Sequence, residues 1–258
     1  MSLKKEFPIL EWDENRISII EPTSLLKEIK NIPECCVITF FREVIEMKKE
    51  KGLLKQIANL HSETLDIPVY ETEKNGQRIC LTLGFIGAAG SAALLEELIA
   101  LGCNKFIVCG GAGVLRKDIA VGHLMVPFSA VRDEGASYHY LPPGREVECK
   151  SEVLAIIEEE LIKINMPYIM EKTWTTDAFY RETKDKVALR VSEGCVSVEM
   201  EAAAFFAVSK FRDVKLGQIL YGGDDLSGEV WDSRGWNRRK NIRENLVDLS
   251  FEICLKIK

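Results

Sequence analysis

Apolar, strand-like segments alternate with helical segments along this chain of 258 residues, and glycines gather where the strands end. The clearest unit is an expected strand at 79–83, a glycine turn, an expected helix at 91–101 and a second expected strand at 105–109. Such alternation predicts parallel strands with helices on the faces of a twisted sheet. We therefore expect one domain over residues 1–258, a three-layer α/β/α fold around a mixed, mostly parallel central sheet.

Further elements are expected on both sides of this unit. Short strands at 17–20 and 37–40 are expected to flank a helix that begins near Thr23 or Ser24, and the charged pattern from 43 to 60 predicts a surface helix. Asn75-Gly76 between apolar segments predicts a β-hairpin. The other expected elements are a strand at 124–127, a helix at 151–164, a strand at 172–176, a strand at 216–221 and a C-terminal helix from about Arg238.

Composition excludes several classes of protein. The net charge of −6 gives no electrostatic footprint for nucleic acid or an anionic membrane surface. No apolar run approaches the length of about 18 residues that a membrane span needs, and Met1–Pro8 has no signal-peptide core. The eight cysteines form no Cys-x-x-Cys pair, and the three histidines are too scattered for a metal cluster. We expect a cytoplasmic protein without a metal.

The strand-to-helix junction at Val198-Glu199-Met200-Glu201-Ala202 carries two glutamates in an otherwise apolar, alanine-rich stretch. Buried glutamate is rare unless it is paired, so this pair suggests a polyol or a cation held by carboxylates. The alternative is a helix N-terminus that favours acidic residues in its first turn.

Three other strand ends carry groups suited to ligand binding. Backbone N–H groups of the Gly110-Gly111-Ala112-Gly113 turn could line an anion or sugar pocket, and its spacing does not match a dinucleotide-binding motif. Asp224-Asp225 follows an apolar strand, where a carboxylic acid could protonate a leaving group, although Asp-Asp-x-Ser-Gly is also ordinary turn chemistry. Phe179 could stack on a flat heterocycle or could be a core residue.

Together these strand ends resemble the nucleoside phosphorylases of the hexameric purine and uridine type, with their nucleosidase relatives. The resemblance runs from about Ile17 to the C-terminus, and residues 198–202 are its strongest motif. The segment 129–140, from Ser129 to Tyr140, is most similar to the uridine phosphorylase branch.

The resemblance implies roles for the residues of the sugar and base sites. Met200 is expected to pack on the ribose, Glu201 to accept hydrogen bonds from its 2′- and 3′-hydroxyls, and Glu199 to support the same pocket. A carboxylate there would also favour an oxocarbenium-like sugar as the glycosidic bond breaks. Phe179 matches the aromatic residue that faces the base.

The resemblance also implies an acid and a phosphate ligand. Asp224 matches the aspartate that protonates the departing base in purine-specific members, and Asp225 could take this role if the alignment shifts by one residue. Arg42 matches an arginine that reaches the phosphate in the adjacent subunit's site. We expect inorganic phosphate as co-substrate, no other cofactor, and a homo-oligomer, either a dimer or a hexamer built as a trimer of dimers.

The chain departs from this family on the phosphate side. Ile20-Glu21-Pro22-Thr23-Ser24 stands where a Gly-Asp-Pro-x-Arg loop is usual, Val108 replaces a second arginine, and Gly111 replaces a phosphate-binding hydroxyl. Charge-assisted contacts contribute on the order of 1.5–3 kcal/mol each, so phosphate binding would need Arg181, Arg116 or another cation. The glutamate base of the nucleosidases has no clear counterpart, because Glu21 lies too early.

The sequence gives conflicting indications of which base is preferred. Asp224 favours purines, whereas residues 132–140 favour uridine. The segment Arg181-Glu182-Thr183-Lys184 has the arginine of a uracil site but not its glutamine. The leading hypothesis is a ribonucleoside phosphorylase that acts on uridine or a purine nucleoside. The alternatives are a nucleoside hydrolase on the same scaffold and a non-catalytic nucleoside-binding protein. Residues 231–236, with two tryptophans, could form part of a lid, and the 43–60 segment could contact a partner subunit or cover the site.

Overall fold

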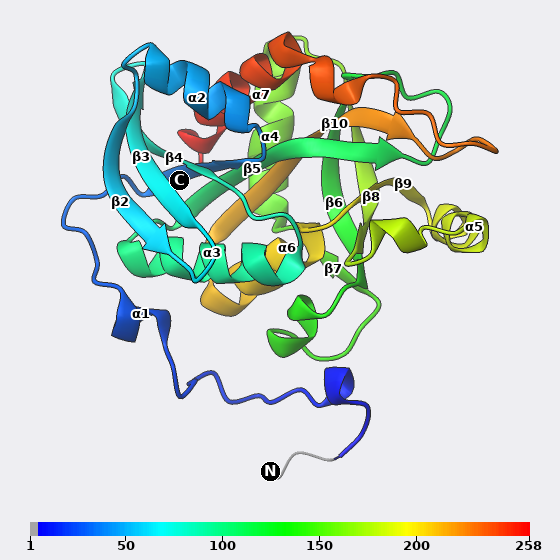
Figure 1. The fold of residues 1–258 in the computed structure, drawn as a ribbon, viewed down its shortest axis with the longest axis horizontal. Helices are drawn as coiled ribbons and strands as arrows, with labels where there is room; N and C mark the ends of the chain where they lie inside the picture. The colour runs from blue at the N-terminus through cyan, green and yellow to red at the C-terminus, as the bar shows by residue number, and fades with distance from the viewer. Residues whose placement is uncertain (1–4) are drawn as a thin grey trace.

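The computed structural model describes residues 5–258 as a mixed α/β fold around one continuous sheet (Figure 1). Residues 1–4, part of the Met1–Pro8 segment discussed above, lie outside the described residues. The strands are β1 (Cys35–Thr39), β2 (Lys55–His61), β3 (Asp66–Lys74), β4 (Gln77–Leu83), β5 (Lys105–Val114), β6 (Leu124–Asp133), β7 (Glu146–Glu148), β8 (Tyr168–Thr176), β9 (Cys195–Glu199) and β10 (Lys215–Asp225).

The strand order is β10-β6-β8-β9-β5-β1-β4-β3-β2, with β7 on β6, and β10 also pairs with β5. This additional pairing closes β5, β10, β6, β8 and β9 into a ring, from which β1, β4, β3 and β2 extend as an open wing. The sheet is mixed, as predicted: β1 is parallel to β4 and β5, β5 to β10, and β8 to β6 and β9, whereas the remaining pairings are antiparallel. β10 pairs with β5 from Lys105 to Val114, and because β5 continues past β1, its last residues also pair with β9.

Helices cover the sheet on both sides, which makes the three-layer fold predicted from the sequence (Figure 1). On one face α3 (Ala88–Leu101) packs against α6 (Ala202–Arg212), and residues 202–209 of α6 are all buried. On the other face α7 (Lys240–Cys254) packs on β1 and β5 and contacts α2 (Arg42–Glu50) and α4 (Ser151–Lys163). The remaining elements are α1 (Pro22–Leu25), α5 (Lys184–Ser192) and the 3-10 helices η1 (Pro8–Leu10), η2 (Ala136–His139), η3 (Phe179–Arg181) and η4 (Trp236–Arg238).

The hairpin predicted from Asn75-Gly76 is confirmed. These two residues have φ of 51° and 75° and join β3 to β4, with Lys74 opposite Gln77. Positive φ at both central residues gives the turn the twist that flanking strands require.

Two predictions in the first 60 residues are wrong. Residues 17–20 form no strand, and Ile17 and Ile19 are 79% and 104% exposed, because no neighbouring strand lies beside them. The expected helix from 43 to 60 ends at Glu50, since Gly52 takes a φ of +69° that breaks the helix, and 55–61 become the edge strand β2 paired with β3. The expected strand at 37–40 overlaps the last three residues of β1, which begins two residues earlier and ends at Thr39.

The glycine turn predicted at 110–113 is also wrong, because β5 runs on through Val114. Its glycines lie in the strand, where they leave room for large neighbours: an added Cβ at Gly111 would lie 3.2 Å from the ring of Tyr221. The other expected helices and strands are present with shifted ends, while β2, β7 and α5 were not anticipated.

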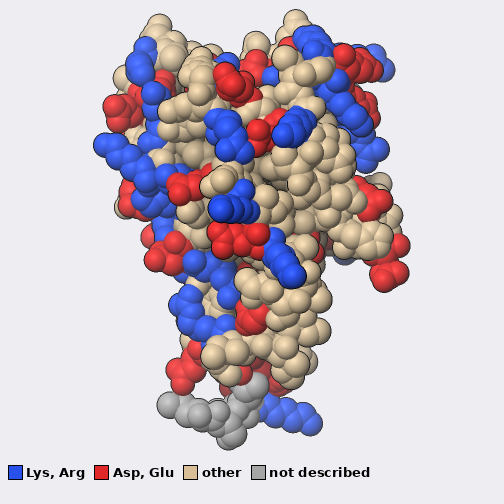
Figure 2. All heavy atoms as spheres, turned by 90° about the vertical axis from the view of Figure 1, so that its left-hand side faces the viewer, with Lys and Arg blue, Asp and Glu red and all other residues tan. Residues whose placement is uncertain are grey.

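The surface shows no concentration of one charge on the face that carries the β2 edge. Figure 2 shows Lys and Arg atoms interspersed with Asp and Glu atoms there. Among the described residues, no helix is long and apolar enough to cross a membrane.

Candidate active site

Glu199 ends β9 and lies beneath the N-terminus of α6. Its Oε1 accepts a hydrogen bond from Thr175 Oγ1 at 2.6 Å, and its Oε2 accepts from the backbone N–H groups of Glu201 and Ala202 at 2.7 and 2.6 Å. Burial raises the pKa of Glu199 to about 7, although these donors oppose the shift. The carboxylate therefore caps α6 and joins it to β8, which fixes the geometry of the junction.

Glu201 lies on the other side of the junction and is only 7% exposed. Its Oε1 accepts from the backbone N–H of Gly87 at 2.7 Å, and its Oε2 accepts from that of Met200 at 3.3 Å. Gly87 precedes the first residue of α3, so the carboxylate rests at the positive end of that helix. Burial, and then the neighbouring Glu199, raise the pKa of Glu201 to about 8.

A cavity of about 980 Å³ opens beside this junction. The ends of β5, β9 and β10, the segment after β8, and the 226–236 segment border it. These ends meet although β5 and β9 are antiparallel, because only the last residues of each strand pair, Gly113 with Val198 and Val114 with Ser197. The lining residues include the aromatics Phe179, Tyr180, Trp231 and Trp236 and the carboxylates Glu182, Glu199, Asp224 and Glu229.

Asp224, near the end of β10, faces the cavity, whereas Asp225 is occupied by its own turn. The indole Nε1 of Trp231 donates to Asp224 Oδ2 at 2.7 Å. Gly113 on β5 leaves the space that Asp224 uses, since an added Cβ there would lie 3.5 Å from Asp224 Oδ1 and 2.5 Å from Leu226 Cδ1. Asp225 Oδ1 instead accepts from the backbone N–H and the hydroxyl of Ser227.

Phe179 lines the cavity from η3 and is 48% exposed, so it is not a core phenylalanine. Its ring lies 4.0 Å, centroid to centroid, from that of Tyr180. Arg181, in the same turn, is exposed and does not line the cavity, whereas the next residue, Glu182, does. Burial, and then the nearby Asp224, raise the pKa of Glu182 to about 7.

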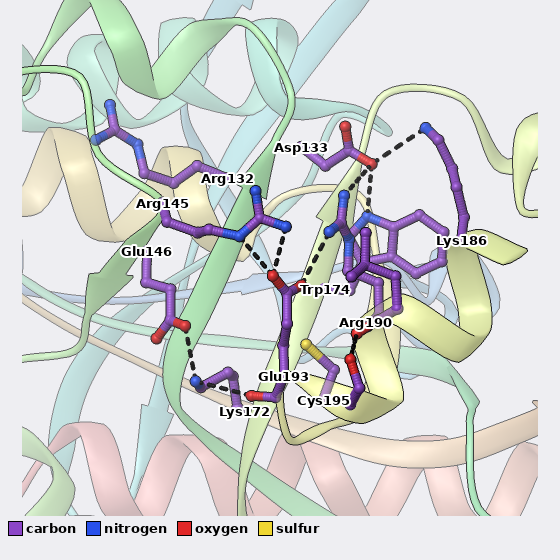
Figure 3. A network of polar contacts seen from close by, with 12 residues as sticks. Arg132, Asp133, Arg145, Glu146, Lys172, Trp174, Lys186, Arg190, Glu193 and Cys195 are labelled. Carbon is purple, nitrogen blue, oxygen red and sulfur yellow. Dashed lines mark hydrogen bonds and ion pairs between the residues drawn. The ribbon is translucent and has the colours of Figure 1, made fainter.

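A network of charged side chains holds the segment that follows these residues (Figure 3). Asp133 Oδ2, at the end of β6, accepts from Trp174 Nε1 at 3.0 Å, from Arg190 at 3.1 Å and from Lys186 at 3.3 Å. Arg190 also pairs with Glu193 at 2.9 Å. The network ties α5 to β6 and β8, and so positions the turn from Phe179 to Glu182 that leads into α5.

Gly110 and Gly111, which were expected to line an anion or sugar pocket, lie against aromatic rings. The Phe40 ring packs between Gly84 and Gly110, where an added Cβ would lie 2.7 and 3.1 Å from it. Val108 is fully buried, and neither Gly110 nor Gly111 borders the cavity.

The arginines proposed from the sequence lie apart from one another. Arg42 begins α2, three residues after β1 ends at Thr39, and its side chain is exposed without an ion pair to another described residue. Arg116 is exposed and paired with Asp118. Arg132 is 5% exposed and donates to Ser137 and to the carbonyl of Pro142, so it belongs to the packing of the 132–142 loop.

The segment Ile20–Ser24, matched above to the loop after the first strand, lies outside the sheet. Glu21 there pairs with Arg212 of α6 at 3.2 Å. The first strand is β1, so the loop after it is Phe40-Phe41-Arg42. Among the described residues, no group of three or more His, Cys, Asp or Glu side chains is arranged to hold a metal ion.

Residues 35–253 match the family model described as the phosphorylase superfamily. The chain belongs to the phosphorylase superfamily. The match begins at the first strand of the sheet and ends in α7, so it covers every strand of the sheet. The N-terminal segment that precedes β1 lies outside it.

Curated relatives from the phosphorylase superfamily bear the names of several nucleoside phosphorylases. A guanosine phosphorylase of Halorubrum lacusprofundi is 26% identical over 187 residues, which are 69% of this chain and 76% of the relative. A uridine phosphorylase of Treponema pallidum is 27% identical over 52% of this chain, and the match spans 57% of that relative. A purine nucleoside phosphorylase DeoD-type of Colwellia psychrerythraea is 23% identical over 72% of this chain and 80% of the relative.

Within this superfamily fold, the hydrogen-bond partners of the site carboxylates were not predicted from the sequence, although Trp231 belongs to the 231–236 segment that was expected as part of a lid. Thr175, Gly87 and Trp231 each hold one of the three carboxylates Glu199, Glu201 and Asp224. Thr175 and Gly87 lie at the ends of expected elements, but their partners are 24 and 114 residues away, so no local pattern could connect them.

Proposed function

We propose that this protein cleaves the N-glycosidic bond of a ribonucleoside with phosphate, giving a free base and ribose 1-phosphate. The observation that carries the proposal is that Glu199, Met200 and Asp224, from two different strand ends, border one cavity. A nucleoside has a polar sugar at one end and a flat base at the other, and this cavity has a buried carboxylate junction at one side and aromatic rings at the other. Family membership supports the same reaction class.

The sugar side of the proposal rests on the Glu199–Glu201 junction. Met200 packs on the ribose, and Glu201 exchanges its hydrogen bonds to Gly87 and Met200 in part for the 2′- and 3′-hydroxyls. As the C1′–N bond lengthens, positive charge develops on the sugar, and a carboxylate in a site of low polarity stabilises it. Glu199 keeps the junction in place, because both of its oxygens are already engaged.

The base side of the proposal assigns the proton transfer to Asp224. Phe179 faces the base, and the electron pair of the breaking C1′–N bond moves onto a base nitrogen that takes a proton from Asp224. The hydrogen bond from Trp231 holds the second oxygen of Asp224 and orients the carboxyl group. Asp225 supports the turn that carries Asp224.

The phosphate side is completed by cations. We assign Arg42 to the anion, with Arg181 as a further contact; a phosphate oxygen then forms the new bond to C1′. Arg42 is exposed, as a residue shared with a neighbouring subunit would be, and this supports a homo-oligomer with at least a dimer as the active unit. Full activity of a monomer, followed by assay and light scattering on dilution, would contradict that assembly.

The test is a panel of nucleosides assayed with and without phosphate, with ribose 1-phosphate and free ribose measured separately. Phosphorolysis predicts ribose 1-phosphate only when phosphate is present, and Arg42→Ala should then raise the KM for phosphate by on the order of 10- to 100-fold. Arg78→Ala is the matched control, since Arg78 lies on β4, pairs with Glu71 and does not border the cavity. Free ribose formed at the same rate without phosphate would reject phosphorolysis.

A second candidate, hydrolysis of the nucleoside, is favoured by one observation. The Phe40 ring fills the space between Gly84 and Gly110, and the Glu201 carboxylate already takes the N-terminus of α3, where an anion would otherwise bind. Two negative groups would not share that helix end. In this case water replaces phosphate as nucleophile, and the panel described above distinguishes the two reactions.

A further inference from the structure

We propose that Glu182 is a specificity-determining residue, whose carboxylate accepts from an amino group on the base and disfavours uracil. The inference rests on the proposed function, because it places the base in the cavity between Phe179 and Asp224. It concerns a different residue, one without a role in the sugar or phosphate sites described above.

The charged side chains that line the cavity are mostly hydrogen-bond acceptors. Four carboxylates border it, and Lys184 is the one lysine or arginine among the lining residues. Lys184 forms an ion pair with Glu229, so its charge is already engaged. Glu199 uses both oxygens on its own junction. Glu182 is therefore the lining carboxylate with both oxygens left to accept from a ligand, since Asp224 is assigned to donate the proton to the base and Glu229 is paired with Lys184.

The Glu182 side chain lines the cavity next to Phe179 and is unpaired among the described residues. It directly follows the η3 turn that carries Phe179, and its backbone N–H donates to the carbonyl of Phe179. Among residues 5–258, its side chain has no hydrogen bond or ion pair. Glu182 and Asp224 line the same cavity, so both groups can contact one ligand. The network around Asp133 holds α5, which begins two residues later (Figure 3).

A cavity lined by hydrogen-bond acceptors discriminates between bases by the donors and acceptors that each base presents. Uracil presents one N–H between two carbonyl oxygens, so a carboxylate that accepts from this N–H also meets oxygens that repel it. An exocyclic amino group presents N–H donors, as on the 2-position of guanine or the 6-position of adenine, and a buried carboxylate accepts from them with a charge-assisted bond. A site built to accept from an amino group rejects the analogue that lacks it, since the carboxylate is then left unpaired.

The experiment compares nucleosides that differ only in the amino group: guanosine with inosine, and adenosine with purine riboside, with uridine as the third class. The wild-type protein should show kcat/KM at least 10-fold higher for the amino-bearing member of one pair, and higher than for uridine. Glu182→Gln should reduce that ratio on the order of 10- to 100-fold while it changes inosine or purine riboside by less than about threefold. Glu229→Gln, a lining carboxylate already paired with Lys184, is the matched control and should leave the ratio unchanged.

Preference of the wild-type protein for uridine, or an unchanged ratio in Glu182→Gln, would overturn the assignment. Failure of the proposed function has a different signature: either no base is released from any nucleoside, or base and free ribose are released at the same rate without phosphate, and neither result depends on Glu182. Calorimetric binding of the free bases guanine, hypoxanthine, adenine and uracil tests the inference without turnover. Tighter binding of guanine or adenine that Glu182→Gln abolishes would support it, and equal binding of all four would reject it.

Discussion

The Glu201 carboxylate accepts a hydrogen bond from the backbone N–H of Gly87 at 2.7 Å, across 114 residues of sequence. The bond joins the N-terminus of α3 to the junction between β9 and α6, so two helices that pack on one face of the sheet also meet at the proposed ribose site. Gly87 has a φ of +97°, a conformation that other residues adopt only with strain.

Removal of the Glu201 charge should abolish most activity. Glu201→Gln keeps the size of the side chain and is expected to lower kcat/KM by on the order of 100-fold, because the carboxylate no longer stabilises charge on the sugar. Since the pKa of Glu201 is raised to about 8 and that of its neighbour Glu199 to about 7, the ionised pair gains population as the pH rises through this range. The wild-type kcat/KM should rise from pH 6 to 8, and Glu201→Gln should lose this limb. A flat wild-type profile would contradict the prediction.

Glu171 should make the fold less stable as the pH rises. It is 1% exposed, one oxygen accepts from the Ser197 hydroxyl at 2.7 Å, and the other has no partner. Burial raises its pKa to about 8, above the ordinary value of 4.5. The folded protein therefore binds the proton more tightly than the unfolded chain, and its stability falls between about pH 4.5 and 8.

Glu171→Gln removes that titration and keeps the shape of the side chain. The variant should match the wild type near pH 4.5 and be more stable by about 1–3 kcal/mol at pH 8, as measured by denaturant unfolding. Glu148→Gln, an exposed carboxylate on β7, is the control and should change neither value. Parallel stability curves for wild type and Glu171→Gln would refute the assignment.

Asp133→Asn should loosen the base side of the site. Burial opposes ionisation of Asp133, but Arg190, Trp174 and Lys186 outweigh it and hold its pKa below the ordinary 3.8. Its stabilising contribution is thus present above about pH 4 and lost as the pH falls through the lowered pKa. At pH 7 we expect a loss of about 1–3 kcal/mol and a higher KM for the nucleoside, because α5 anchors the turn with Phe179 and Glu182. An unchanged KM at full stability loss would show that the turn is positioned independently.

Phe40→Ala tests whether the Phe40 ring limits the room for phosphate at the proposed anion site. Loss of the ring from between Gly84 and Gly110 should destabilise the protein by about 2–4 kcal/mol, within the range for a partly buried phenylalanine. If the ring restricts phosphate, the KM for phosphate should fall while the KM for the nucleoside stays within about twofold. A rise in the KM for phosphate would instead mean that the ring shapes the site.

The sequence predicted well where local pattern and tertiary structure agree. The Asn75-Gly76 hairpin, the α3 unit and the β9–α6 junction each have a strong local signal, and each is present. The failures occur where distant partners decide. The glycines of β5 read as a turn from the local sequence, yet they stay in the strand because Phe40, Tyr221 and Leu226 occupy the space beside them. The expected helix at 43–60 fails because β3 offers 55–61 a strand partner.

The cavity was predictable only in part for a similar reason. Glu199, Met200, Asp224 and Phe179 stand at strand ends, which the alternation of elements marks, and all four border it. The position of Arg42 relative to the sheet depends on which strand comes first in the chain. Residues 17–20, which have no strand partner, were predicted as that strand, whereas the first strand is β1. Glu182 was noted in the sequence only as part of a segment that lacks the glutamine of a uracil site, because its place in the cavity depends on strand ends that are distant along the chain, such as that of Asp224.

The closed ring of five strands limits how this protein can adapt to its ligands. The last residues of β5 are bonded to β9 on one side and to β10 on the other, so the distance between the Glu199 junction and Asp224 is set by hydrogen-bond register. Moving the Glu199 junction away from Asp224 would break backbone hydrogen bonds between paired strands, because the sheet has no free edge at that point. The width of the cavity between these two strand ends is therefore fixed. A larger or smaller base can be accommodated only by movement of the η3 turn and the 226–236 segment. We expect the amide hydrogens of these two segments to exchange far faster than those of the strands beneath them.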